Sequence, residues 1–272
     1  MTPNEIYEKI KANERKGIFD CHIEGSPEEM VIPVDENYHY PGHRSFFENL
    51  KYIIEKIILV IPFTRLLNLI HYRTKYVGRE NLKGLKAAVI TGNHIQKFDC
   101  LAIKNGTRGH RTFVLAAPFN NMKGFWGEMM RAGDMVPMSS TRKGQIKFLR
   151  VVEDILKKRK KFLLIYPEAS MWLNYKKPRP YKDGAFRFAA EYSVPVVAQF
   201  ITMKDRKKRD KYGDTLKKLT IYISKPIYPR PDLSIKENTA FLKESAFSFS
   251  KKIYETVYGE KLTYLTEEEN EQ

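Results

Sequence analysis

Short apolar runs alternate with helix-length amphipathic segments from residue 78 to residue 258, and this alternation limits the possible folds more than any other feature. The apolar runs are rich in β-branched and aromatic residues, as buried strands are. Strands are expected at residues 87–91, 112–116, 135–138, 162–166, 194–201 and 219–224. Helices are expected at residues 98–104, 123–131, 143–158, 183–192 and 236–258. The alternation predicts an α/β fold with a mixed, largely parallel sheet flanked by helices.

The chain is strongly basic, and its positive charge is confined to the middle. Lys and Arg number 48 against 32 Asp and Glu, which gives a formal net charge of +16. Residues 46–259 carry +24, whereas the segments on either side each carry −4. A field of this sign favours a polyanionic partner such as nucleic acid or an anionic membrane. The chain divides into an acidic extension (1–45), an amphipathic segment (46–76), a main domain (77–260) and an acidic tail (261–272).

The number of cysteines and the lengths of the apolar runs indicate the cellular compartment in which the protein is expected. Cys21 and Cys100 are too few for a disulfide scaffold, and no Cys/His cluster has the spacing of a metal site. No segment has the pattern of a signal peptide, and no run of ~18 uncharged apolar residues suggests a conventional membrane-spanning helix. We therefore expect a reduced, cytoplasmic protein with no bound metal or redox cofactor.

The most apolar part of the chain is residues 46–70, which we interpret as an amphipathic helical pair. Apolar residues recur from Phe46 at the i, i+3, i+4 spacing of one helical face. Ser45 and Glu48 have the spacing of a capping box, and Pro62 predicts a kink between two helices. Two placements are open at this point. The pair could pack on the core of the main domain, or it could lie in a membrane interface with flanking cations near lipid phosphates.

A candidate catalytic pair follows the first predicted strand of the main domain. His94 comes directly after that strand, and Asp99 begins the next predicted helix. In an open α/β sheet, active groups gather at the carboxyl ends of the strands. A carboxylate folded back onto the imidazole would fix its tautomer, so that His94 could accept a proton from an alcohol. The spacing by itself has low specificity, because it also arises by chance.

Five motifs in order resemble those of the HxxxxD glycerolipid acyltransferases, the family that includes 1-acyl-sn-glycerol-3-phosphate acyltransferases. The first is Asn93-His94 followed after four residues by Asp99, and the others lie at 133–138, 166–170, 182–186 and 194–197. The resemblance covers residues 75 to 228. It implies transfer of a fatty acyl group from acyl-CoA or acyl carrier protein to a lysophospholipid hydroxyl. In this reaction His94 would be the general base and Asp99 would orient it.

The resemblance also implies a set of substrate-binding residues. Glu168 would bind the glycerol hydroxyls of the acceptor, and Arg142 and Lys182 would bind its phosphate. The full expected set is Asn93, Arg142, Glu168, Ser170, Lys182 and Gly184. Two family arginines are replaced in this chain, by Ser139 and Met171. We favour 1-acyl-sn-glycerol-3-phosphate as the acceptor, while another lipid or glycolipid alcohol stays open.

An acceptor held in a bilayer favours the interfacial placement of residues 46–70. We therefore expect a peripheral or monotopic protein at the cytoplasmic face of the membrane. Its expected partners are membrane lipids and the acyl-CoA or acyl carrier protein donor, without nucleic acid. The basic runs at 157–161 and 204–211 are either solvated faces or sites that bind anionic lipid or acyl carrier. The rival interpretations are a degenerate acyltransferase relative and a non-catalytic basic protein that binds lipid or nucleic acid.

Overall fold

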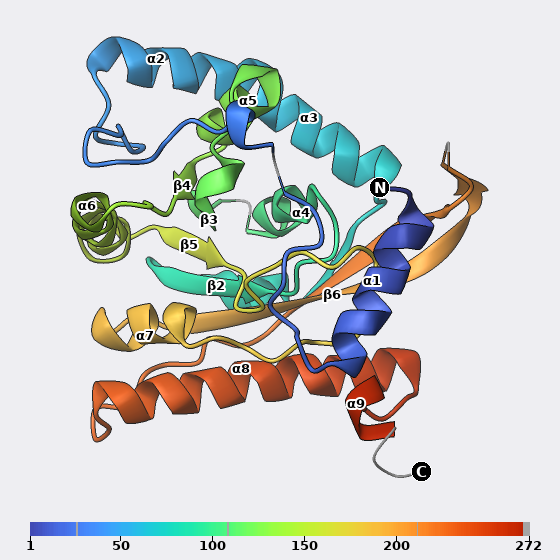
Figure 1. Ribbon diagram of the computed structural model, residues 1–272. Helices are drawn as coiled ribbons and strands as arrows, with labels where there is room; N and C mark the ends of the chain where they lie inside the picture. Colours follow the sequence, from blue (N-terminus) through green and yellow to red (C-terminus); the bar gives the residue numbers. More distant parts are fainter. Residues whose placement is uncertain (26, 108, 211, 269–272) are drawn as a thin grey trace.

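The fold is built on one seven-stranded sheet, in the order β1-β7-β6-β2-β5-β3-β4 (Figure 1). A computed structural model describes residues 1–25, 27–107, 109–210 and 212–268 of the chain. The strands are β1 Lys75–Val77, β2 Ala88–Gly92, β3 Thr112–Ala116, β4 Met135–Pro137, β5 Phe162–Ile165, β6 Val196–Arg209 and β7 Thr215–Ile223. Neighbouring strands are parallel except β6 and β7, which are antiparallel. The predicted fold class is confirmed, and the short edge strand β1 is added to it.

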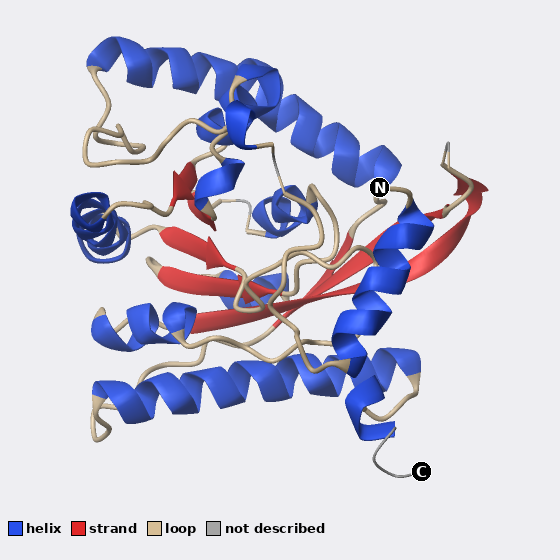
Figure 2. Cartoon of the chain, viewed as in Figure 1, coloured by secondary structure: helices blue, strands red, loops and turns tan. Residues whose placement is uncertain are grey.

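Helices cover both faces of the sheet (Figure 2). The α-helices are α1 Pro3–Arg15, α2 Phe46–Glu55, α3 Ile61–Leu66, α4 Asp99–Gly106, α5 Gly124–Ala132, α6 Arg142–Glu153, α7 Gly184–Glu191, α8 Ile235–Tyr258 and α9 Leu265–Glu268. Segments of π-helix are η2 Lys56–Val60, η3 Leu67–His71 and η6 Asp154–Lys158. Short 3-10 turns are η1 Glu28–Met30, η4 Arg79–Leu82 and η5 Pro118–Asn120.

The two faces of the sheet belong to separate apolar clusters, because successive side chains of a strand point to opposite sides. In β2, Val89 lies in the cluster that includes residues of α6, α7 and α8. The next residue, Ile90, lies in the cluster that includes α4 and Tyr72. Burial on both faces explains the continuous apolar runs of these strands in the sequence.

Residues 46–71 form one continuous helical stretch, which bends between α2 and α3 (Figure 1). The segments α2, η2, α3 and η3 follow one another directly, and Pro62 is the second residue of α3. In the π-turn before Pro62, the Ile61 N–H donates to Lys56 O, so the hydrogen-bond pattern has already shifted where the proline enters. The predicted capping box is present, with the Glu48 N–H donating to Ser45 Oγ and the Ser45 N–H to Glu48 Oε2.

The apolar face of the 46–71 stretch points away from the sheet. Its exposed apolar side chains are Phe46, Phe47, Leu50, Ile53, Ile54, Ile57, Ile58, Leu59, Ile61, Leu66, Leu69 and Ile70. Polar side chains lie on the inner side, where Lys56 pairs with Asp134 and Asn68 is buried. Among the described residues, no helix has the length and apolar character needed to cross a membrane.

The N-terminal residues pack against the main domain. Ile6 and Ile10 of α1 share an apolar cluster with Trp172 and Tyr175, and the Trp172 indole N–H donates to Cys21 O at 3.2 Å. The acidic extension at 1–45 also contributes Val34 and Tyr40 to the cluster that includes residues of α6, α7 and α8. Part of the acidic tail, residues 269–272, lies outside the described residues.

Candidate active site

His94 and Asp99 form a hydrogen-bonded pair at the carboxyl end of β2. The His94 Nδ1 lies 3.0 Å from Asp99 Oδ2, and the same oxygen accepts the N–H groups of Ile95 and Gln96 at 2.7 and 3.0 Å. The Asp99 side chain is fully buried at the start of α4, whereas the His94 side chain is 25% exposed. Because Asp99 Oδ2 acts as the acceptor for both backbone N–H groups and for the ring, Nδ1 is assigned as the protonated ring nitrogen. The Nε2 lone pair is left to accept a proton from a bound hydroxyl.

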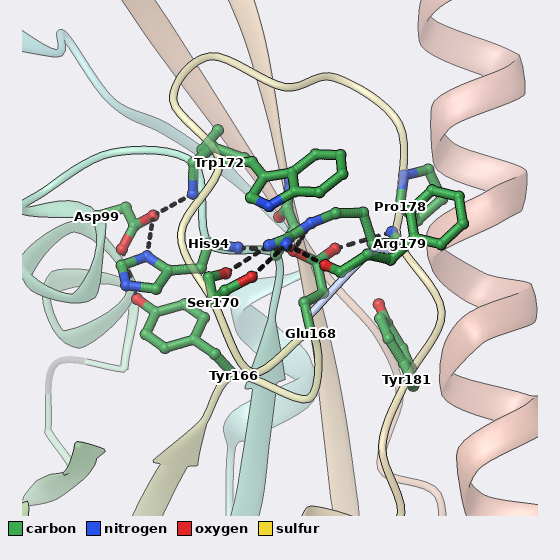
Figure 3. A network of polar contacts seen from close by, with 12 residues as sticks. His94, Asp99, Tyr166, Glu168, Ser170, Trp172, Pro178, Arg179 and Tyr181 are labelled. Carbon is green, nitrogen blue, oxygen red and sulfur yellow. Dashed lines mark hydrogen bonds and ion pairs between the residues drawn. The ribbon is translucent and has the colours of Figure 1, made fainter. Parts of the chain in front are cut away.

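Tyr166 contacts both residues of the His94–Asp99 pair. Its hydroxyl donates to Asp99 Oδ1 at 2.6 Å, and its ring stacks on the His94 imidazole with centroids 4.1 Å apart. Burial, and then the neighbouring Asp99 carboxylate, raises the pKa of Tyr166 well above its usual value. The phenol therefore stays protonated and keeps donating to Asp99. Both oxygens of Asp99 are thus occupied, which fixes the plane of the imidazole (Figure 3).

Glu168 is buried behind His94 and paired with Arg179. The two side chains are each 1% exposed, and Arg179 Nη2 lies 2.6 Å from Glu168 Oε2. The same Oε2 accepts the backbone N–H of His94 at 3.2 Å, and Oε1 accepts the N–H of Arg179 at 3.0 Å. Figure 3 shows Arg179 between Glu168 and Ser170, under the Trp172 ring. In this structure the Glu168 carboxylate holds the backbone that carries His94, and its contact with the acceptor stays a prediction.

Asn93 and Ser170 also serve the fold. The Asn93 amide is fully buried, donates to Ile201 O at 3.0 Å and accepts the Ile201 N–H at 2.7 Å. It joins the end of β2 to β6 across the sheet. Ser170 is 2% exposed, and its Oγ accepts from Arg179 Nη1 at 2.7 Å. In this structure Asn93 bonds to backbone and Ser170 to Arg179, and the substrate-binding role expected of both stays a prediction.

The other expected substrate-binding residues are exposed. Arg142 begins α6, which follows β4, the edge strand three places from β2 and thus about 14 Å away. Lys182 pairs with Asp20 at 2.7 Å, and Gly184 is the exposed first residue of α7.

Comparison with known proteins places this geometry in a family. Residues 73–202 match the sequence model of the family described as Acyltransferase. The chain carries an acyltransferase domain. A crystal structure of the 1-acyl-sn-glycerophosphate (LPA) acyltransferase PlsC from Thermotoga maritima has a similar fold, with a TM-score of 0.53 and 15% identity. The similarity covers 76% of this chain and 96% of that chain. No curated protein matches the sequence significantly.

The acyltransferase site has contributors that the sequence motifs did not reveal. Arg179 lies eleven residues beyond Glu168 and stands between two prolines. The prolines restrict the backbone on both sides of Arg179, and this restriction is the one local signal in the sequence that points to it. The N-terminal segment contributes Phe19, whose carbonyl accepts from Arg179 Nη1 at 2.8 Å. It also contributes Glu24, which pairs with Lys97 of the HxxxxD loop at 3.3 Å. Nothing in the local sequence pattern linked residues 19–24 to the site.

Proposed function

We propose that this acyltransferase moves a fatty acyl group from a thioester donor to the free hydroxyl of a lysophospholipid. The donor would be acyl-CoA or an acyl carrier protein, and the acceptor that we favour is 1-acyl-sn-glycerol-3-phosphate. The observation that carries the proposal is the His94–Asp99 pair at the end of β2, with Nε2 left to accept a proton. The fold shared with PlsC, an acyltransferase whose name specifies 1-acyl-sn-glycerophosphate, supports the choice of acceptor.

In the proposed mechanism, His94 Nε2 removes the proton from the acceptor hydroxyl as its oxygen attacks the thioester carbonyl. Asp99 stabilises the imidazolium that forms. The tetrahedral intermediate then collapses, the carbon–sulfur bond breaks, and the thiolate takes the proton from His94. The acyl group passes directly from sulfur to oxygen, so no acyl-enzyme forms.

We further propose that the enzyme works at the surface of a membrane, with the exposed apolar face of the 46–71 stretch in the interface. Side chains such as Phe47 and Leu69 are 79% and 76% exposed, which is unfavourable in water and favourable among lipid acyl chains. An interfacial position would give the site access to a lysophospholipid without removing it from the bilayer. The cytoplasmic face is the side that we propose.

A second acceptor class is favoured by one observation. Ser139 and Met171 replace two family arginines, and Ser139 is buried with its hydroxyl donating to Val34 O at 2.5 Å. Neither residue supplies the positive charge that a phosphate headgroup requires. Another lipid or a glycolipid alcohol is therefore the alternative acceptor.

The test is incubation of the purified protein with labelled acyl thioester and a panel of lysolipids and glycolipids, followed by mass identification of the product. We expect acylated lysophosphatidate, and a different acylated product would select the alternative acceptor. His94→Ala and Asp99→Asn should each lower kcat by about 100-fold or more, because the base or its orientation is lost. Full acyl transfer by His94→Ala would refute the mechanism.

A further inference from the structure

The β6–β7 hairpin extends beyond the sheet as a basic arm. β6 is buried as far as Met203, and from Lys204 onward its side chains are mostly exposed. Residues 204–218 contain eight lysines and arginines against three aspartates, with Lys211 outside the described residues. Figure 1 shows this arm projecting past the sheet on the side where the helical stretch ends at η3.

The three aspartates of the arm are engaged close to where they lie. Asp205 pairs with Lys217 at 2.6 Å, and Asp214 accepts from the Tyr7 hydroxyl at 2.7 Å. Asp210 accepts the N–H groups of Tyr212 and Asp214 in the turn. With eight basic and three acidic side chains, residues 204–218 keep a net charge of +5.

Other lysines that the structure describes in the arm make no contact that explains their charge. Within the described part of the chain, Lys204, Lys207 and Lys208 form no ion pair. Lys204 also lies opposite Lys218 in the register of β6 and β7. Like charges directly opposite each other destabilise a strand pair, so this arrangement costs stability unless an anion lies nearby.

The arm is continuous with the exposed apolar face of the 46–71 stretch. The Arg206 guanidinium donates from Nη1 to Ile70 O at 3.0 Å and to His71 O at 2.5 Å. Burial, and then the positive charges of Arg206 and Lys208, lowers the pKa of His71, which agrees with both cations lying beside the helix end. Ile70 and its neighbour Leu69 are 58% and 76% exposed. Cations thus adjoin the apolar side chains that would enter a bilayer.

We propose that this basic arm binds the acidic headgroups of an anionic phospholipid bilayer. The inference rests on the proposed membrane association, and it adds the lipid class that the surface selects. Apolar side chains at the end of η3 enter the acyl-chain region, and the neighbouring lysines meet the lipid phosphates. The arm therefore directs the enzyme to anionic rather than neutral membranes.

The test compares two triple variants in vesicle sedimentation, with no substrate present. Lys204→Gln/Lys207→Gln/Lys208→Gln removes three charges from the arm. Lys158→Gln/Lys160→Gln/Lys161→Gln removes three from the basic run after α6, at the other side of the molecule in Figure 1. We expect the first variant to bind vesicles containing phosphatidylglycerol more weakly, by roughly fivefold per lysine. The second variant should bind as the wild type does, and binding to pure phosphatidylcholine should be the same for all three proteins.

Equal binding of the two variants to anionic vesicles would overturn the proposal. So would an arm variant that binds vesicles normally but loses transfer only from acyl carrier protein, since the arm would then bind the carrier.

Thermal unfolding of both variants checks that they fold, and the single-lysine variants repeat the comparison if a triple variant does not fold. Acyl transfer from acyl-CoA to a detergent-dispersed acceptor should be unchanged in the arm variant. A protein that binds anionic vesicles through the arm but transfers no acyl group would refute the proposed function and leave this inference intact.

Discussion

Glu168 and Arg179 show how a buried charge pair can determine the position of a neighbouring catalytic residue. Each side chain is 1% exposed, so neither charge has water to stabilise it. The Glu168 carboxylate accepts the N–H of His94, and Arg179 supplies the opposite charge. A buried pair of this kind costs desolvation, but breaking it by removal of one partner costs more.

We expect Arg179→Met to lower the free energy of unfolding by about 3 kcal/mol, because it leaves the Glu168 carboxylate buried without a counter-ion. It should lower kcat more than it raises KM, since the backbone of His94 loses its support. The double variant Glu168→Gln/Arg179→Met should recover much of the stability, as no charge is left buried. A double-mutant cycle tests this, with urea unfolding and steady-state kinetics of the wild type, Arg179→Met, Glu168→Gln and the double variant. A double variant whose loss of unfolding free energy equals the sum of the two single losses would contradict the expectation.

At the scale of elements, Asp134 connects three parts of the molecule. Its carboxylate pairs with Lys56 of η2, with Lys104 of α4 at 3.6 Å and with Arg111 at 2.7 Å. Burial alone would raise the pKa of Asp134, but the charges of Lys104, Lys56 and Arg111 outweigh it and lower the pKa. Because α4 begins with Asp99, this cluster ties the exposed helical stretch to the helix that carries a catalytic residue.

We expect Asp134→Asn to lower the free energy of unfolding by about 3 kcal/mol at neutral pH, as the partly buried Lys104 loses its counter-ion. A lowered carboxyl pKa stabilises the folded state above the unfolded value of ~3.9, and this stabilisation is lost as the pH falls below it. The stability gap between wild type and variant should therefore narrow in acid. Urea unfolding at neutral pH and below pH ~4 measures the gap. A gap of the same size in acid would contradict this account of the cluster.

The 46–71 stretch is an element whose apolar face is turned outward. Its isoleucines follow the period of a core-facing helix, yet Ile54 and Ile58 are 47% and 64% exposed. The inner side instead makes ion pairs such as Lys51 with Glu128 at 3.1 Å. Exposed apolar area of this extent is unfavourable in water, which supports the proposed interfacial placement.

We expect Ile54→Asp/Ile58→Asp/Ile61→Asp to reduce binding to vesicles at least ~10-fold, because it removes apolar area from the interface and adds negative charge there. The matched control is Ile146→Asp/Leu149→Asp, which changes two exposed apolar residues of α6 (50% and 45%). Liposome co-sedimentation measures both variants. A folded 46–71 variant that pelleted as the control does would rule out the interfacial placement.

At the scale of the whole molecule, the central charge of +24 gives the chain a long-range attraction to anionic surfaces. Attraction between solvent-exposed charges is screened by salt, with a Debye length of about 10 Å at 0.1 M and about 3 Å at 1 M. Apolar insertion is not weakened in this way.

Acyl transfer on vesicles that contain phosphatidylglycerol should therefore fall as sodium chloride is raised from about 0.1 to 1 M, by roughly 10-fold or more. Transfer to a detergent-dispersed acceptor should change much less. Rate measurements on both forms of acceptor across the salt series test this. Equal salt sensitivity in detergent would place the effect in the active site and not in membrane attraction.

Features that depend on neighbours in the chain could be predicted from the sequence. The alternation of apolar runs and helical segments predicted the α/β fold, since strand and helix periods are local properties. The capping box at Ser45 and the His94–Asp99 pair were also predictable, because the groups that meet are only a few residues apart. Within the site, the predicted contact that the structure confirms is the one between His94 and Asp99, which are close in the chain.

Tertiary structure decided the partners of the buried polar groups and the direction of the apolar face. Asn93 meets Ile201, 108 residues away, only because β6 lies beside β2 in the sheet. Glu168 meets Arg179 because the intervening loop folds back beneath Trp172. A helical period specifies which residues share a face, but ion pairs such as Lys56 with Asp134 determine which face turns inward. Local periodicity acts through neighbouring residues, whereas burial and charge pairing depend on segments that only the completed fold brings together.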